Sequence, residues 1–464
     1  MKDAETSLLE LLADVGLAPE LADTVMFSGS DPVLRLPYRI AAAAQAAIAA
    51  CGVAAAAVHT ARGGPRQRVA IDAAAAVAAM RSYRYFKIDA LTPGDNGDPL
   101  TGFYPTADGR WVYLHCNFFN LKRANLALLD VADDKAAVAQ AVAGWNGLVL
   151  EEALFAAGGC GALVRSPEEW RALPQYASVM QEPVLRLRRM GDAPRLNLPL
   201  AERPFQGLRV IDLTRVLAGP TATKVLASHG AQVLRLNRED LADSGFFDFD
   251  NGLGKRSAFV DLRTPEGRVA MDALLGECDV FVQAYRPTAL AGLGYSTQEL
   301  VQRKPGLVVV NLNAWGFTGP WRERRGYDTV VQSANGLAWT GEGQVPRFLP
   351  VAAQDYLAGY LMALGAMAAL QRRQQEGGSW EVDISLAGVG EWFRSHGSVD
   401  PEVWAQAPAE LSAQQLAACT TDSPSAAGVL SHLRAMPDMS ATPPHWVQPA
   451  VPRGTHAPAW WNGE

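Results

Sequence analysis

GLRVIDLTRVLAGPTATKVLASHGAQVLRLN, residues 207–237, decides the fold of this 464-residue chain. Residues 207–214 are apolar and β-branched, which is typical of a buried strand, and RVLAGP provides a turn. A small-residue helix follows, with Pro220 expected at its first position, where the missing N–H costs nothing. QVLRLN then predicts a second strand, so the segment is expected to form a βαβ unit.

The same alternation continues toward the C-terminus. Helical patterns at 265–275, around 297–303 and at 355–375 each precede a strand-like run, DVFVQAY, GLVVVNLNAW and SWEVDIS in turn. Strands separated by helices of this length indicate a parallel sheet covered on both faces. We therefore expect residues 207–393 to form one doubly wound, Rossmann-like α/β domain.

The first half of the chain has a different organisation. ADG lies between two aromatic strand-like runs in GFYPTADGRWVYLHCN and indicates a hairpin, and helical patterns follow it. Residues 87–200 are therefore predicted to be a smaller α+β domain, which ends at the Pro-rich boundary 196–206. Residues 394–464 are rich in Pro and Ala and end in tryptophans, so they are expected to dock on the body.

An internal repeat relates the two ends of the chain. The segment from Ile40 and the segment from Tyr356 each contain a long small-residue helix, a Gly-Gly turn and a strand. Residues 1–86 are therefore predicted to be a degenerate partial copy of the α/β domain tail, in which Ala42 replaces Asp355. Two unrelated Ala-rich helices remain the alternative.

Composition narrows the functional classes. The formal net charge of −7 leaves no basic surface for nucleic acid or an anionic membrane. Five scattered cysteines without CxxC spacing and an acidic amphipathic N-terminus favour a cytoplasmic protein. The Ala-rich run 40–58 is interpreted as a core helix, because Gln45 and Gly52 interrupt it. Dispersed histidines make a metal site unexpected, and no GxGxxG, P-loop or GxSxG pattern occurs in the α/β half.

Asp355 is the first candidate for chemistry. It follows the apolar run LPVAAQ at the start of a long helix, with small residues around it, and we expect it at the carboxyl edge of the sheet, where such folds bind ligands. An aspartate at that position is also an ordinary helix N-cap. The basic candidates lie in turns or after strands and would suit a polyphosphate ligand: Arg215, Arg238, Lys255, Arg256, Arg286, Arg324 and Arg325.

Several stretches resemble the family III coenzyme A transferases. Residues 207–237 resemble the opening of these enzymes, and GKRSAFVDL, AYRPTALAGLGY, NAWGFTGPWRERRGYDTVVQSANGL and QDYLAGYLMALGAMAALQRR match in order. The resemblance covers roughly 207–393. The smaller domain of the family normally follows the α/β domain, whereas here it precedes it, so the chain resembles a permuted, or fused and truncated, pair of family modules.

The resemblance implies residue roles. The catalytic aspartate of the family falls on Asp355, which would carry an acyl anhydride and then an aspartyl-CoA thioester. The implied coenzyme A contacts are Arg215, Val216, Leu217, Ala218, Arg238, Lys255, Tyr285, Arg286, Arg325 and Tyr327. The implied ligands are acyl-CoA as co-substrate and a carboxylic acid, and the implied assembly is a homodimer.

Three departures and two alternatives accompany the resemblance. An arginine common in the family is replaced near Gly292, Leu217 stands where some members carry Gln, and GDNGDP, residues 94–99, is a faint candidate for the glycine-rich flap. Racemases of the same fold need a histidine where this chain has Tyr327, which disfavours racemisation. A non-catalytic acyl-CoA-binding protein is the other alternative.

Overall fold

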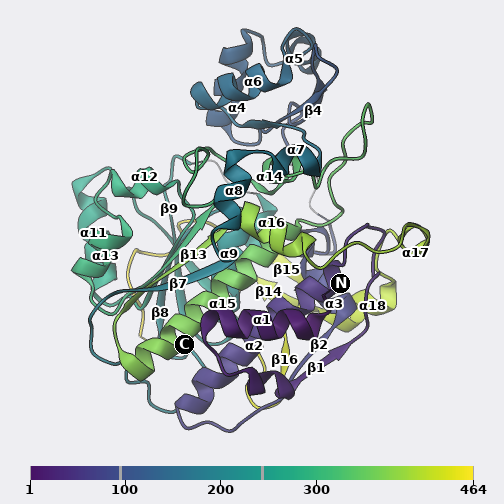
Figure 1. Ribbon diagram of the computed structural model, residues 1–464. Helices are drawn as coiled ribbons and strands as arrows, with labels where there is room; N and C mark the ends of the chain where they lie inside the picture. The colour runs from purple at the N-terminus through teal and green to yellow at the C-terminus, as the bar shows by residue number, and fades with distance from the viewer. Residues whose placement is uncertain (1, 93–96, 242–244, 463–464) are drawn as a thin grey trace.

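The computed structural model describes residues 2–92, 97–241 and 245–462. Its centre is a seven-stranded sheet with the order β10-β9-β8-β11-β12-β13-β7, in which only β7 runs antiparallel to its neighbour (Figure 1). The strands are β8 (Arg209–Leu213), β9 (Gln232–Asn237), β10 (Lys255–Phe259), β11 (Val280–Gln283), β12 (Val308–Asn313), β13 (Ser379–Ser385) and β7 (Leu185–Gly191). The six parallel strands follow the Rossmann order 3-2-1-4-5-6, so the predicted doubly wound α/β fold is confirmed.

Helices cover both faces of this sheet (Figure 1). One face holds a core that includes Ile211, Met271 and Val309, and the other holds a larger core that includes Val210, Leu357 and Val382. The helices between the parallel strands are α9 (Ala218–Ser228), α10 (Phe246–Asp250), α11 (Pro265–Gly276), α12 (Pro287–Ala291), α13 (Thr297–Arg303), α14 (Asp328–Ala334) and α15 (Ala353–Glu376), and α16 (Leu386–Arg394) follows β13.

Helix α9 begins earlier than predicted. It starts at Ala218, so Pro220 occupies its third position rather than its first. The N–H groups of the first turn have no partner within the helix, and proline is therefore tolerated there without loss of a hydrogen bond.

The small domain is narrower than the predicted range 87–200. Its own core includes Leu100, Val112, Leu150 and Leu163, and its sheet has the order β4-β5-β6. Its elements are β4 (Gly102–Pro105), β5 (Trp111–Leu114), α4 (Phe119–Leu129), α5 (Lys135–Val142), α6 (Gly147–Ala156) and β6 (Gly161–Leu163). The expected hairpin forms, since β4 pairs antiparallel with β5.

The segment after β6 returns to the main body. Helices α7 (Pro167–Arg171) and α8 (Pro174–Met180) lead into β7, which pairs with β13 at the edge of the main sheet. Arg186 and Arg188 of β7 form ion pairs with Asp383 and Glu381 of β13, in addition to the antiparallel backbone pairing of the two strands. Sequence pattern alone could not reveal this, because the pairing joins residues far apart in the chain.

The N-terminal segment repeats the element order of the domain tail. Strand β1 (Val25–Ser28), helix α2 (Ile40–Ala61), strand β2 (Val69–Asp72) and helix α3 (Ala73–Ala79) correspond to β12, α15, β13 and α16. Both strand pairs are parallel; α2 lies between β1 and β2, whereas α14 precedes α15 in the connection from β12 to β13. Helix α2 is long and apolar enough to cross a membrane by length and composition, but 89% of its apolar window is buried inside the structure, as in a core helix.

The remaining elements close the molecule around this body. They are α1 (Ala4–Val15), β3 (Lys87–Ile88), α17 (Pro401–Gln406), α18 (Ala413–Cys419), β14 (Thr420–Ser425), β15 (Gly428–Leu433) and β16 (Asp438–Met439). Strand β16 pairs with β2, and β15 pairs with β3. The indole N–H groups of Trp446 and Trp460 donate hydrogen bonds to the carbonyls of Lys224 and Leu274, so the C-terminal segment lies against the α/β body.

Candidate functional site

The crossing of helices α9 and α15 positions Asp355. The two helices touch at Gly359, where an added Cβ atom would lie 2.6 Å from the carbonyl oxygen of Ala218. Asp355 is one turn earlier on α15 and therefore on the same face as Gly359. Because α15 leads into a parallel strand, its N-terminus lies at the carboxyl edge of the sheet, as does the turn that follows β8. Asp355 therefore faces the turn 215–218.

Asp355 is not a helix cap. The N-cap position is Ala352, and the segment that immediately precedes α15 is irregular rather than a strand. The Asp355 side chain is 7% exposed. Within residues 2–92, 97–241 and 245–462, no hydrogen bond or ion pair engages its carboxylate. The N-cap alternative is therefore wrong, and the carboxylate is left for another role.

A second carboxylate lies behind Asp355. Asp328, the first residue of α14, accepts a hydrogen bond from the Asp355 backbone N–H at 3.0 Å. Burial, together with the negative charge of Asp328, raises the pKa of Asp355 well above its ordinary range. Burial also raises the pKa of Asp328 to about 6, although hydrogen bonds from Asp355 and Gln332 oppose the shift. Such like-charged pairs with displaced pKa values are common at functional sites.

The corresponding N-terminal position has a similar supporting aspartate but no carboxylate at the predicted counterpart of Asp355. Asp31 accepts hydrogen bonds from the N–H groups of Ala41 and Ala42 at the start of α2, much as Asp328 supports the start of α15. The predicted counterpart of Asp355 is Ala42, whose methyl group cannot react with a thioester. Of the two helices compared, α2 and α15, only α15 therefore carries a carboxylate at this position.

The turn after β8 has a strained backbone. Val216 adopts φ of 72°, in the left-handed region that β-branched residues avoid. Leu217 and Ala218 are buried beside it, and the amide of Asn251 donates to the Val216 carbonyl at 3.4 Å. Strain of this kind persists where the surrounding structure enforces it, which is typical of binding turns.

Basic side chains from several loops converge near this turn. Burial raises the pKa of Tyr285, and the positive charges of Arg215 and Arg238 oppose this shift. Burial also lowers the pKa of Arg325, and the charge of Arg286 adds to that shift. Burial is the main cause of the raised pKa of Tyr327. The positive charges of Arg215 and Arg325 lower this pKa, whereas the negative charge of Asp355 raises it. The structure thus brings most of the predicted site residues to one edge of the sheet, where strand order reverses between β8 and β11.

Lys255 differs from the other predicted contacts. Its ammonium is 2% exposed and lies 3.0 Å from the Asp212 carboxylate, 2.7 Å from the Pro220 carbonyl and 2.7 Å from the Thr223 hydroxyl. Burial lowers its pKa to about 8, while Asp212 opposes that shift. These partners occupy the three donors of the ammonium. The geometry therefore favours a role beneath the turn, in holding β8, β10 and α9 together, over a direct ligand contact.

The sequence reasoning missed an aromatic stack contributed by the small domain. The ring of His115 lies 4.2 Å from that of Tyr327, and Phe118 lies 5.4 Å from Tyr327. The Arg215 guanidinium is 4.9 Å from the Phe118 ring, which is cation–π distance. Only the run YLHCNFF hinted at these residues, since their meeting with Tyr327 depends on domain packing. The flap candidate 94–99 cannot be assigned, because residues 93–96 lie outside the described residues.

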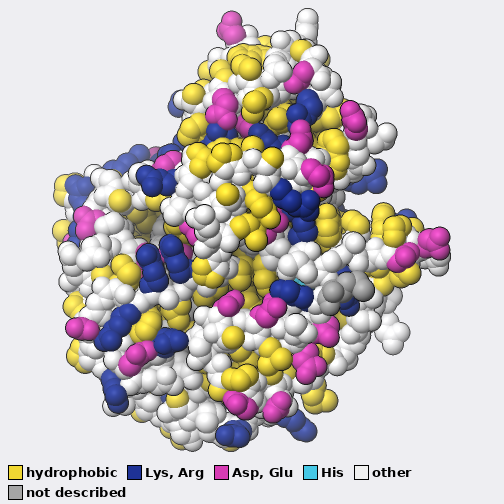
Figure 2. All heavy atoms as spheres, in the orientation of Figure 1, with side chains coloured by type: hydrophobic (Ala, Val, Ile, Leu, Met, Phe, Trp, Pro, Cys, Tyr) yellow, Lys and Arg dark blue, Asp and Glu magenta, His cyan; other side chains and the backbone are white. Residues whose placement is uncertain are grey.

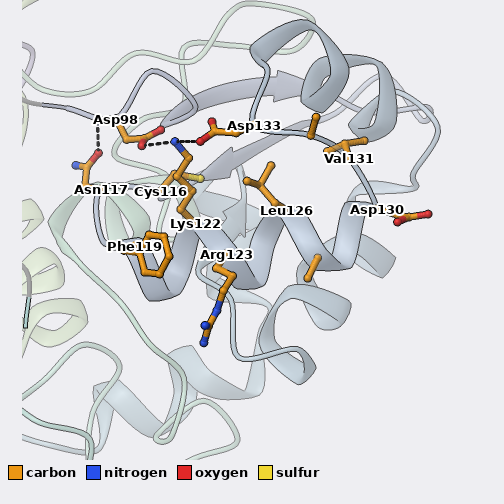
Figure 3. Close-up of a pocket in the computed structure, with 12 residues that line it drawn as sticks. Asp98, Cys116, Asn117, Phe119, Lys122, Arg123, Leu126, Asp130, Val131 and Asp133 are labelled. Carbon is orange, nitrogen blue, oxygen red and sulfur yellow. Dashed lines mark hydrogen bonds and ion pairs between the residues drawn. The ribbon is translucent and has the colours of Figure 1, made fainter. Parts of the chain in front are cut away.

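A surface pocket of about 810 Å³ lies in the small domain (Figure 3). Its Lys122 is paired with Asp98 at 2.8 Å and with Asp133 at 2.7 Å, so its charge is already compensated. Asp355 is not part of its lining. Figure 2 shows Lys and Arg side chains on the face below the small domain, interspersed with acidic ones. In the described parts of the chain, no group of three or more His, Cys, Asp or Glu side chains could hold a metal ion.

Comparisons with known proteins extend these observations. The model of CoA-transferase family III matches residues 205–451, more than half of the chain. An acyl-CoA transferase of Gibberella moniliformis is 30% identical over 62% of this chain and 55% of its own length. A succinate–glutarate CoA-transferase of Agrobacterium fabrum is 31% identical over 42% of this chain and 53% of its own length.

The solved structures include Rv3272 from M. tuberculosis. It is 31% identical, with a TM-score of 0.40 over 42% of this chain and 56% of that chain. The chain spans about half the length of these relatives.

Proposed function

Because this chain belongs to CoA-transferase family III, we propose that it moves coenzyme A between two carboxylic acids through covalent adducts on Asp355. One observation carries the assignment to this residue. An unpaired, buried carboxylate faces the turn that follows the first strand of a Rossmann-type sheet, in the same neighbourhood as Arg215 and Arg325. Nucleophile and anion-binding groups therefore share one edge of the fold.

The proposed reaction has four balanced steps. The Asp355 carboxylate attacks the thioester carbonyl of the donor, the C–S bond breaks, and a mixed anhydride and CoA thiolate result. The thiolate attacks the aspartyl carbonyl, releases the donor acid and forms an aspartyl-CoA thioester. The acceptor carboxylate then displaces the thiolate from Asp355 to form a second anhydride. Finally the thiolate attacks the acceptor acyl group and returns Asp355 as a free carboxylate.

The surrounding residues support this chemistry in two ways. Guanidinium groups bind phosphate oxygens through two hydrogen bonds at once, so Arg215, Arg238, Arg286 and Arg325 suit the phosphates of coenzyme A. A thiolate that remains attached to the phosphate-anchored coenzyme also stays close to Asp355 between steps, which makes its return effectively intramolecular.

The protonation of Asp355 sets the pH dependence of the proposed reaction. Only the ionised carboxylate attacks a thioester, and burial together with Asp328 raises the pKa at which ionisation occurs. The same shift makes the ionised group more basic and hence a stronger nucleophile. We therefore infer that activity rises with pH across the titration of Asp355.

The direct test is chemical trapping. Purified protein is treated with an acyl-CoA and then with hydroxylamine, which should convert an acylated Asp355 into a hydroxamate that peptide mass spectrometry detects. Asp355→Asn should yield no hydroxamate and no transfer, whereas Asp23→Asn, at an exposed position, should behave as wild type. A non-catalytic acyl-CoA-binding protein would yield no modified peptide in any variant.

Three further features remain proposals of the same kind. The donor and acceptor acids of this chain are to be identified by screening acyl-CoA thioesters against free acids. A homodimer, inferred from the family, is testable by sedimentation equilibrium. A cytoplasmic location, inferred from the scattered cysteines, is testable by cell fractionation.

A further inference from the structure

His115 is a buried imidazole that has no hydrogen-bond partner within residues 2–92, 97–241 and 245–462. The residue is 5% exposed, and neither ring nitrogen has a partner among the described residues. An imidazole carries one donor and one acceptor when neutral, and leaving such groups buried and unpaired destabilises the folded protein. Native structures rarely accept that cost without a ligand or a functional reason.

The His115 ring is held in a fixed orientation against Tyr327, which connects it to the proposed reaction centre. One face stacks on Tyr327 at 4.2 Å with an interplanar angle of 18°. Tyr327 directly precedes Asp328, whose carboxylate binds the N–H of Asp355. The backbone of His115 is also fixed, since its N–H donates to the Cys160 carbonyl at 3.0 Å and its carbonyl accepts from Asn125 at 3.3 Å. Stacking uses the ring face, and both nitrogens at the ring edge are buried without a hydrogen-bond partner among the described residues.

A second buried histidine, His229, serves as a comparison, because an unpaired imidazole indicates a ligand only where it lies near a candidate site. Both ring nitrogens of His229 also lack a partner in the part of the chain that the structure describes, and the residue is 1% exposed. However, His229 lies at the C-terminal end of α9, next to Phe205, at the opposite edge of the sheet from Asp355. His229 therefore provides a matched control with the same side chain and burial but no nearby nucleophile.

Resting on the proposed function, we propose that His115 is a specificity-determining residue that hydrogen-bonds an uncharged second oxygen, hydroxyl or keto, on the acyl group held at Asp355. The aromatic rings of Tyr327 and Phe118 lie beside His115 and suit the carbon skeleton of a hydroxy or keto acid. Plain alkyl acids would leave the imidazole unpaired and would be disfavoured.

The surroundings of His115 keep the imidazole neutral. Burial lowers its pKa to about 3, so it carries no charge near neutral pH. A neutral ring can donate to a keto oxygen, or donate to and accept from a hydroxyl group, depending on its tautomer. A base whose conjugate acid is so strong is poorly suited to removing a proton alpha to a thioester, so recognition fits this imidazole better than proton transfer.

The test measures binding in an Asp355→Asn background, where no transfer consumes the ligand. Titration calorimetry compares butanoyl-CoA with 3-hydroxybutanoyl-CoA, and propanoyl-CoA with lactoyl-CoA, so each pair differs by one hydroxyl oxygen. The background protein should bind at least one hydroxylated thioester roughly 10- to 100-fold more tightly than its plain partner. Adding His115→Phe should abolish this preference, His115→Asn should keep part of it, and His229→Phe should leave it intact.

The outcomes separate this inference from the proposed function. Equal affinities within both pairs, or a preference that survives His115→Phe, would overturn the role of His115. If hydroxylamine still traps Asp355 in the wild-type protein, the transferase proposal stands while the specificity proposal fails. If no acyl-CoA binds at all, both proposals fail. Thermal unfolding of each variant identifies misfolded protein, and His115→Asn supplies a smaller polar replacement if His115→Phe does not fold.

Discussion

Asp355→Asn should abolish transfer, and it should also make the protein more stable than the wild type by an amount that grows as pH rises. The substitution keeps the shape of the side chain, and no described hydrogen bond to the carboxylate is lost. What it removes is an ionisable group that burial and Asp328 hold in the protonated form. The stability gain therefore measures how strongly the fold opposes the charge of its own proposed nucleophile.

The magnitude follows from proton linkage. In the unfolded chain Asp355 loses its proton near its ordinary pKa of 3.8, whereas the folded protein retains it to higher pH. The folded state then binds more protons, so its stability falls by about 1.4 kcal/mol per pH unit between these two pKa values. Asn avoids this loss, so the gain should grow by about 1.4 kcal/mol for each pH unit until the folded-state pKa of Asp355 is reached.

Urea unfolding followed by circular dichroism at several pH values measures this difference. The variant and the wild type should have nearly equal free energies of unfolding at about pH 4, and the difference should grow until it levels off at the folded-state pKa of Asp355. The exposed Asp23→Asn should show no such growth. A difference for Asp355→Asn that stays constant over the whole range would refute the reasoning, because it would mean that the carboxyl group is already ionised in the folded protein.

Three other outcomes are expected. Gly359→Ala should destabilise the protein and reduce transfer in an activity assay, because the new Cβ atom would meet the Ala218 carbonyl at 2.6 Å. Gly276→Ala, whose new Cβ atom would have no atom within 4 Å, should do neither. Equal effects of the two substitutions would contradict the helix crossing. Lys255→Met should cost about 3–5 kcal/mol in urea unfolding, since it leaves the buried Asp212 uncompensated, and an unchanged midpoint would contradict that pairing. The kcat/KM for transfer should rise about tenfold per pH unit below the Asp355 pKa, and a flat profile would mean that Asp355 does not titrate in the rate-limiting step.

Much of the fold was readable from local patterns. Hydrophobic periodicity and turn or capping residues predict the strands β9 and β13 and the helix α13 at their observed bounds. The range predicted for the small domain includes the edge strand β7, because the pairing of β7 with β13 joins distant parts of the chain. No local pattern encodes a partner almost 200 residues away.

Some residues of the candidate site could be predicted from the sequence, and others could not. Asp355 and most of the arginines follow from their place in the α/β pattern and from the family resemblance. The burial of the Lys255 ammonium could not be foreseen, because it depends on three groups that only the packed fold assembles around it. The contact of His115 with Tyr327 likewise arises from the docking of the small domain. The neighbouring carboxylates of Asp328 and Asp355 come from separate helices whose starts meet only in the fold.

Oxygen exchange into Asp355 tests the central claim most directly. The protein turns over an acyl-CoA with an acceptor acid whose carboxyl oxygens are both oxygen-18, and the peptide containing Asp355 is then analysed by mass spectrometry. The four-step reaction predicts that the bridging oxygen of the second anhydride remains on Asp355, so this peptide gains heavy oxygen with turnover. Transfer of coenzyme A without any label in this peptide would contradict covalent catalysis by Asp355.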